Sequence, residues 1–283
     1  MGVASSLASL YRVYVVQLRQ EADAQAELER ARGGADRQMV GVVLTVLGVL
    51  ILFNYFGHSG RLGAWVSLLK DVGAIDPEFS LRASVFGGEQ AQIARKVFWA
   101  GARVVGYVLV PLALARIVAP GRPVVELLGL TLRDPLRHVR VYGLMLAVIA
   151  PFVVAASFLP DFQRKYPFYK IGPDESLWPW FVAWEILYAL QFVGLEIFYR
   201  GFMVHGLKVR LGYGSIFVMM IPYMMIHFGK PLPECVGSIV AGFVLGTMSL
   251  KSGAIWGGAA LHVIVAWSMD ALSLWHQGRL LPG

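Results

Sequence analysis

Ionisable side chains inside apolar stretches are the residues of this chain that could do chemistry. They are Glu196, Arg200, His227, Glu234, His262 and Asp270. A charged group within a membrane helix is costly and usually marks a functional site. Glu196 precedes Arg200 by four residues, which is the order in which a helix best pairs an acid with a base. The spacing therefore predicts a paired charge inside a spanning helix.

A short turn offers a way to bring these residues together. Gly212-Tyr213-Gly214 can end the helix that carries Glu196 and begin a hairpin. Glu196 lies sixteen residues before this turn and His227 thirteen residues after it, so at ~1.5 Å per residue their depths differ by ~5 Å. His262 lies about midway along the last apolar run, with Asp270 on roughly the same helical face. We expect the acid and the two imidazoles to face each other.

Such a set supports hydrolysis. A carboxylate can take a proton from water, one histidine can share or relay it, and a second histidine can donate to the oxyanion. Glu234 opens the next apolar run at the depth where His227 ends the preceding one, which makes it a candidate second carboxylate. The hypothesis from spacing alone is a water-holding pocket in an apolar bundle.

The composition sets the environment of this pocket. Hydrophobic residues make up 57% of the 283 residues, charged residues 15%, and the mean hydropathy is +0.61. Repeated apolar runs near twenty residues are typical of a helical membrane protein. The net charge is +7, and the basic residues lie mostly between these runs, as expected for loops beside anionic lipid headgroups. Nucleic acid is therefore a poor candidate for a partner. A single cysteine excludes an internal disulfide.

The predicted fold is therefore an all-α, polytopic membrane bundle of about seven spans with amphipathic interfacial helices. The spans are residues 39–56, 97–118, 142–159, 179–203, 215–228, 234–250 and 253–275. We divide the chain into an N-terminal amphipathic and charged helix, N-terminal membrane helices with an interfacial connector, a catalytic membrane core and a tail, at 1–37, 38–125, 126–276 and 277–283. The first helix either lies on the membrane surface or packs on the bundle. Residues 57–96 favour an interfacial segment, and glycines spaced by four predict tight packing in the last two spans.

The distribution of basic residues predicts the orientation. An N-terminus on the inner side places 1–38, 119–141, 204–214 and Lys251 there, with a modest excess of Lys and Arg. We expect a multi-pass protein of the bacterial inner membrane with a cytoplasmic N-terminus.

Three ordered motifs resemble a known family. They are Glu196-Ile-Phe-Tyr-Arg200-Gly201-Phe202, Tyr223-x-x-x-His227-Phe228-Gly229 and His262. They are similar to the motifs of the CPBP family, the CAAX-protease and bacteriocin-processing intramembrane endopeptidases, over roughly residues 126–275. The resemblance implies a bundle of membrane helices, with a glutamate-activated water that cleaves a peptide bond of a membrane-anchored protein. It implies no required cofactor, although a divalent metal, if present, would fall to Glu196, His227 and His262.

Two positions depart from the family pattern. The first motif usually has two adjacent acids, and the first of them, the usual base, is Leu195 here. The third motif often has Asn or Asp four residues after its histidine, where this chain has Ala266. In a single-acid branch of the family, Glu234 would supply the second carboxylate, and Asp270 would replace the residue missing after the last histidine.

Each candidate also has a structural interpretation. Glu196 and Arg200 can form an ion pair without catalysis, with Arg200 in either case an orienting partner. His227 and His262 can be core histidines, and Glu234 can be a helix N-terminal acid. Among the remaining polar residues, we interpret Glu185 as an interface residue, Cys235 as a packing residue, and His58, His138, His205 and His276 as solvated or at headgroup level.

Other protease classes fit less well. No His-Glu-x-x-His zinc motif occurs. Gly57-His58-Ser59-Gly60 matches a short serine-protease pattern but is more simply a turn, and Asp270 lacks the second aspartate of an aspartyl intramembrane protease.

Three functions stay open. The preferred one is an intramembrane endopeptidase that removes a tail or leader from a lipidated or membrane-anchored protein. An inactive family member acting as a scaffold or immunity partner is favoured by Leu195 and Ala266. A proton-coupled transporter would also use intramembrane Glu and His, although no inverted repeat is evident.

Overall fold

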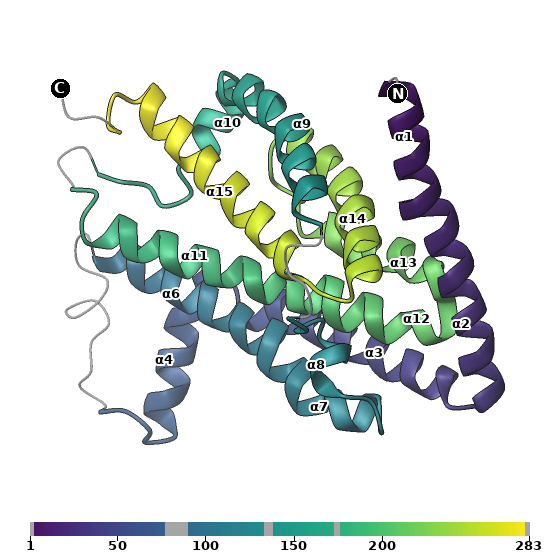
Figure 1. Cartoon of the computed structure of the whole chain (residues 1–283). Coiled ribbons are helices and arrows are strands. Elements are labelled where there is room, and N and C mark those ends of the chain that lie inside the picture. The colour runs from purple at the N-terminus through teal and green to yellow at the C-terminus, as the bar shows by residue number, and fades with distance from the viewer. Residues whose placement is uncertain (1–2, 77–89, 133–137, 173–175, 281–283) are drawn as a thin grey trace.

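The computed structural model describes residues 3–76, 90–132, 138–172 and 176–280 (Figure 1). Within these ranges the regular elements are helices, and the single β-type contact is an isolated antiparallel bridge between Leu130 and Ala254. The all-α prediction is confirmed.

Six helical segments, rather than seven, are long and apolar enough to cross a membrane in the described part of the chain. They are Ala35–Phe56, Gln92–Val118, Val139–Ser157, Trp180–Met225, Leu232–Ser252 and Trp256–His276. The difference arises because the fourth and fifth expected spans, 179–203 and 215–228, form one 46-residue helical segment. The chain is therefore an integral, multi-pass membrane protein.

This long segment nevertheless reverses direction. It consists of α11 (Trp180–Glu196), a π-helical stretch (Ile197–His205), α12 (Gly206–Leu211), a 3-10 turn (Gly212–Gly214) and α13 (Ser215–Met225). Gly212 has a φ of 54°, a conformation that residues with a Cβ rarely adopt. Beyond the turn, α13 packs back against the π-helical stretch. Its 11 residues extend ~16 Å, which is shorter than the ~30 Å hydrocarbon core.

The glycine pair of the sixth expected span packs closely, as predicted, whereas Gly253 of the second pair ends α14 (Leu232–Ser252), and a Cβ there would meet nothing within 4 Å. In α14, a Cβ on Gly242 would lie 3.0 Å from Met220, and one on Gly246 would lie 2.9 Å from Ile216. The face that carries these glycines therefore packs directly against α13. The final helix, α15 (Trp256–His276), lies between α9 (Val139–Ser157) and α11 (Figure 1).

The part of the N-terminal helix from Leu18 onward packs on the bundle, whereas Leu7 and Tyr11 of its first part are exposed. The helix runs through α1 (Val3–Tyr11), a π-helical stretch (Arg12–Gln17) and α2 (Leu18–Arg32), and α2 contacts α12 and the turn that follows it. Oδ1 of Asp23 accepts a hydrogen bond of 2.9 Å from the backbone N–H of Tyr213. This helix therefore supports the corner of the hairpin.

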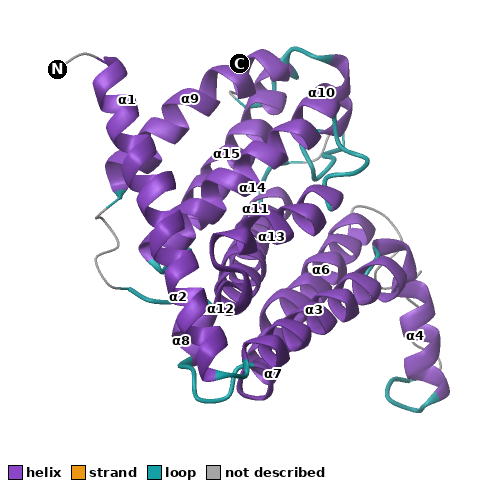
Figure 2. Cartoon of the chain, turned by 90° about the vertical axis from the view of Figure 1, so that its right-hand side faces the viewer, coloured by secondary structure: helices purple, strands orange, loops and turns teal. Residues whose placement is uncertain are grey.

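The end of segment 57–96, which the sequence predicted to be interfacial, belongs to the second spanning segment. The short helix α4 (Leu62–Asp71) stands away from the bundle and exposes Trp65, Leu68 and Leu69 (Figures 1 and 2). In contrast, α6 (Gln90–Val104) begins the second spanning segment earlier than expected. That segment continues through a π-helical stretch (Val105–Leu109) to α7 (Val110–Val118). Residues 77–89 lie outside the described part of the chain.

The remaining elements are α3, its π-helical continuation and two short connectors. Their bounds are Ala35–Ile51 for α3, Leu52–Phe56 for its continuation, Val124–Leu127 for α8 and Pro160–Lys165 for α10. The main hydrophobic core lies where α3, α7 and α8 surround the π-helical stretch 197–205, all nine residues of which are buried. The fold therefore places one segment of the hairpin at the centre of the molecule.

Candidate active site

Glu196 ends α11 at this buried centre. Its side chain is fully buried, and Oε1 lies 3.0 Å from Nη1 of Arg200, one turn further along. The same oxygen lies 2.8 Å from Nδ1 of His262 on α15. The predicted ion pair is present, and the last spanning helix adds a histidine to it.

His262 is held on three sides. Nε2 lies 2.9 Å from the hydroxyl of Tyr223, and the imidazole stacks on Phe192 at a centroid distance of 5.4 Å and an interplanar angle of 17°. An ionised carboxylate can only accept, so Nδ1–H donates to Glu196 and Nε2 accepts from the phenol. These contacts on both nitrogens fix the orientation of the imidazole of His262.

Tyr223 is the site residue that our reading of the sequence missed. It is buried on α13, its ring lies 3.9 Å below Cζ of Arg200, and its centroid is 5.0 Å from that of His227. The available signal was its position four residues before His227, which places both side chains on one face of a helix. Tyr223 contacts Arg200, His227 and His262 and so connects the three motifs.

His227 is connected to the site by its contacts with Tyr223. Its Nδ1 lies 2.9 Å from the backbone carbonyl of Tyr223, so Nδ1–H donates and Nε2 is left as an acceptor. His227 lies just outside the spanning segments. Burial, together with nearby Lys230, lowers its pKa to about 4. The imidazole is therefore neutral at physiological pH.

Glu234 lies in a neighbouring polar cluster. One carboxylate oxygen accepts a 2.6 Å hydrogen bond from the hydroxyl of Tyr166, and the other pairs with Lys230. Within the described residues, no hydrogen bond joins Glu234 to Glu196 or His262. The structure therefore places Glu234 beside the loop that carries Tyr166, without direct contact by a hydrogen bond to Glu196 in the described residues.

Asp270 is placed apart from His262. It is 1% exposed, and its Oδ1 accepts a 2.9 Å hydrogen bond from the backbone N–H of Phe168. Two turns of α15 separate it from His262, and buried Ala266 lies between them. In this conformation Asp270 holds a loop, and it does not occupy the place of the residue missing from the third motif.

Leu195, at the position of the missing first acid, belongs to the apolar core. It is 4% exposed and packs in the cluster formed with α3 and the second spanning helix. Its side chain therefore leaves the helix on a different face from Glu196, which is in contact with α15.

Space beside Glu196 depends on a glycine. A Cβ on Gly258 of α15 would lie 2.6 Å from Oε2 of Glu196. This oxygen has no hydrogen-bond partner among the described residues. It is therefore the atom of the carboxylate that is available to accept a further hydrogen bond.

His205 is a correction to the sequence interpretation. It is 2% exposed rather than solvated, because the π-helical stretch turns it into the core. His138 and His276 are also partnered, by Tyr14 and Ser157 respectively. Only His58, which accepts from the backbone N–H of Gly60, is exposed as expected.

The structure also places Ser59, Cys235 and Glu185, which we interpreted from the sequence as structural residues. Ser59 begins a 3-10 turn, as expected for the Gly-His-Ser-Gly sequence. Cys235 is partly buried, with its Sγ 3.9 Å from the sulfur of Met224. Glu185 lies on α11 near Asp270 rather than near Glu196.

The residues offer a poor fit for a metal. No group of three His, Cys, Asp or Glu side chains suited to a metal occurs in the described residues. The shared oxygen of Glu196 is already engaged by the guanidinium of Arg200 and by Nδ1 of His262. A cation at this oxygen would be repelled by the arginine.

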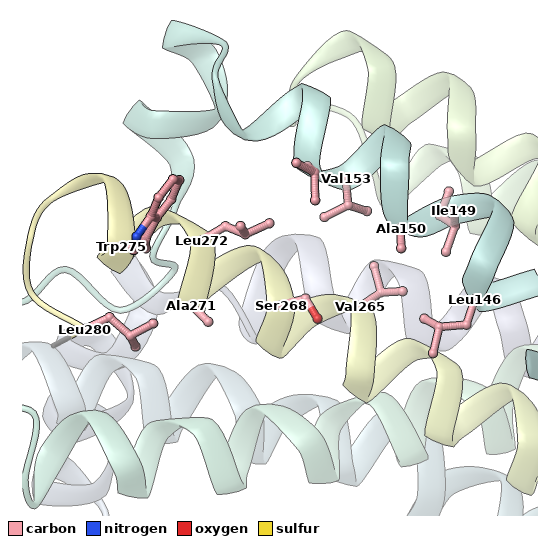
Figure 3. Close-up of a pocket in the computed structure, with 11 residues that line it drawn as sticks. Leu146, Ile149, Ala150, Val153, Val265, Ser268, Ala271, Leu272, Trp275 and Leu280 are labelled. Atoms are coloured by element: carbon pink, nitrogen blue, oxygen red, sulfur yellow. The ribbon is translucent and has the colours of Figure 1, made fainter.

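An apolar groove runs between α9 and α15 (Figure 3). Its volume is about 360 Å³, and side chains such as Leu146, Val153, Leu272 and Trp275 line it from the two helices, with Ser268 as the polar exception. Val265 of this lining lies one helical turn beyond His262. The groove therefore approaches the site along α15.

Comparisons with known proteins agree with the motifs. Residues 177–268 match the family model described as type II CAAX prenyl endopeptidase Rce1-like. Neither curated proteins nor solved structures gave a match. The matched segment contains Glu196, Arg200, Tyr223, His227 and His262. Over this segment, the chain is similar to CAAX-type membrane proteases, which supports the resemblance to the CPBP family.

Proposed function

We propose that the chain is an intramembrane endopeptidase in which Glu196 activates water to cleave a peptide bond. The observation that carries the proposal is the buried contact of Glu196 with Arg200 and His262, which come from two spanning helices. A carboxylate held by two polar partners inside an apolar bundle is suited to general-base chemistry.

Each residue has a role that follows from its ion pair or its hydrogen bonds. Oε2 of Glu196 takes a proton from water, and the oxygen of that water attacks the peptide carbonyl. The proton then passes to the leaving amine as the C–N bond breaks. Arg200 and His262 fix the carboxylate through Oε1, and Tyr223 fixes His262.

Of the two roles that the sequence suggested for the histidines, donation to the oxyanion does not fit His227. Its Nδ1–H is used by the carbonyl of Tyr223, so the free Nε2 can accept a hydrogen bond but cannot donate one to an oxyanion. We therefore assign His227 to holding the attacking water. Glu234, held by Tyr166 and Lys230, would serve as a second carboxylate at the edge of the site.

The proposed substrate is a membrane-associated protein with a lipid, leader or tail. The family match supports this class, and the groove along α15 would take an apolar chain that leads to His262. We propose that neither a metal nor another cofactor is required, with the bacterial inner membrane as the location and the N-terminus in the cytoplasm.

The experiment is a cleavage assay with the purified protein in liposomes and a membrane-tethered peptide library. We expect cleavage that persists in strong chelators. Absence of cleavage for every tethered peptide would favour the inactive scaffold, for which buried Leu195 and Ala266 are the supporting observation. Loss of cleavage on chelation, with recovery on adding a divalent metal, would overturn the metal-free mechanism.

A further inference from the structure

A chain of three hydrogen bonds ends on the main chain of Arg200. Nζ of Lys208 lies 3.1 Å from Nδ1 of His205, and Nε2 of His205 lies 3.1 Å from Oγ of Ser249 on α14. The same hydroxyl donates to the backbone carbonyl of Arg200 at 3.1 Å. Both His205 and Ser249 are 2% exposed. The chain thus links α12, α14 and the π-helical stretch at the level of the ion pair.

Chemistry gives this chain a single direction. A lysine amine is a donor, so Nδ1 of His205 accepts and carries no proton. Nε2 then carries the proton of the neutral ring and donates to Ser249, whose own proton goes to the carbonyl of Arg200. The donor and the acceptor are therefore fixed in each of the three hydrogen bonds.

The main chain at Arg200 is also held from the opposite direction. A Cβ on Gly201 would lie 2.2 Å from the carbonyl oxygen of Leu128, so these two backbones touch. The peptide between Arg200 and Gly201 is therefore fixed by the hydroxyl of Ser249 and by packing against the segment after α8.

Placement of this peptide decides where the guanidinium lies. Arg200 must reach Oε1 of Glu196 at 3.0 Å while its Cζ stays 3.9 Å above the ring of Tyr223. A shift of its backbone by a fraction of an ångström would change both contacts, and misplacement of about 1 Å in a catalytic constellation can cost ~100-fold in rate. A buried polar chain costs free energy compared with apolar packing, which argues for a purpose beyond filling space.

We propose that Lys208, His205 and Ser249 are positioning residues that act on Glu196 through the main chain of Arg200. This inference rests on the proposed peptidase function for its activity readout. Within the described part of the chain, no hydrogen bond joins these three side chains to Glu196 or His262, so their effect is indirect.

The key variant is Ser249→Ala, which removes one oxygen atom. We expect kcat to fall about tenfold to a hundredfold, with KM within about twofold of wild type and the thermal midpoint nearly unchanged. Ser249→Thr keeps the hydroxyl and should restore most of kcat, and His205→Gln, which keeps a donor near Ser249, should lose less than His205→Ala. The matched control is Thr247→Val, which removes another buried hydroxyl of α14, the one that bonds Tyr213.

A second readout does not depend on peptidase activity. Nitrogen NMR of 15N-histidine-labelled protein in micelles should show His205 neutral and protonated on Nε2. In Ser249→Ala, the His262 signals should shift because Arg200 and Glu196 move, whereas in Thr247→Val they should not. If the wild type cleaves no peptide but these shifts occur, the positioning role stands and the proposed function fails.

Other outcomes overturn the positioning role itself. Wild-type kcat in Ser249→Ala, an equal loss in Thr247→Val, or a change confined to KM would each do so while leaving the peptidase proposal intact. Should Ser249→Ala not fold, the tautomer of His205 in the wild type decides: protonation on Nδ1 would contradict the donor order.

Discussion

His262 and Glu196 are 66 residues apart in sequence, yet Nδ1 of one lies 2.8 Å from Oε1 of the other. This contact joins α15 to the end of α11 inside the bundle. It also fixes the orientation of both groups, since Arg200 holds the same oxygen and Tyr223 holds the far side of the imidazole.

Removal of the tyrosine hydroxyl tests the orientation of His262. Tyr223→Phe keeps the ring under Arg200 but removes the donor to Nε2 of His262. Loss of one hydrogen bond in the site should lower kcat by about tenfold to a hundredfold. Steady-state kinetics on a tethered peptide provide the measurement. Tyr213→Phe, which loses a hydroxyl bonded to Thr247 away from the site, should keep wild-type kcat; equal effects of the two changes would contradict the role of Tyr223.

Gly258 provides a steric test of the carboxylate. In Gly258→Ala the new methyl group would meet Oε2 of Glu196 at 2.6 Å, so the carboxylate must turn away from its present position. We expect kcat to fall by roughly a hundredfold or more while the protein still inserts and folds. Gly237→Ala is the control, because a Cβ at this helical position meets nothing within 4 Å. Full activity of Gly258→Ala would show that Oε2 is not the reacting atom.

Acid should destabilise the protein through His227. Burial lowers the pKa of His227 from 6.5 to about 4, so below pH 6.5 the unfolded chain binds a proton that the folded chain resists. Stability should therefore be lost as the pH falls from 6.5 to 4, by up to about 3 kcal/mol. Thermal unfolding in detergent across this range is the measurement.

Two variants separate the contribution of His227 to this pH dependence from the contributions of other groups. His227→Gln should flatten the pH dependence of the midpoint, whereas His58→Gln, at an exposed position, should leave it unchanged. A pH dependence of the same size in His227→Gln would mean that other groups cause the acid sensitivity.

The sequence predicted the outline of the site because its signals are local. Apolar runs predict helices, and the glycine turn before α13 predicts the hairpin that brings the first and second motifs together. The contact of Glu196 with Arg200 follows from helical spacing alone.

What the sequence could not predict depends on departures from regular periodicity and on loops. The π-helical stretch changes the spacing of side chains, which is why His205 is buried rather than solvated. Glu234 lies apart because the hydroxyl of Tyr166 binds it, and Asp270 because the backbone of Phe168 does. Both contacts come from the loop after α10, whose path has no helical or strand pattern.

The site residues themselves can be ranked by a pair of acid substitutions. Glu234→Gln should lower kcat less than Glu196→Gln does, because Glu234 is bound by Lys230 and Tyr166 at the edge of the site. Parallel kinetics on one tethered peptide measure the two losses. A larger loss in Glu234→Gln would move the catalytic carboxylate to α14.

The proposed peptidase depends on the carboxylate of Glu196, which takes the proton from water. The test is the cleavage rate of a membrane-tethered peptide by Glu196→Gln in liposomes, with Glu185→Gln, a partly buried acid earlier in α11, as the matched control. We expect a loss of about 10²- to 10⁴-fold in kcat for Glu196→Gln at an unchanged thermal midpoint, and near wild-type kcat for Glu185→Gln. A Glu196→Gln protein that folds and cleaves at the wild-type rate would contradict this role of Glu196.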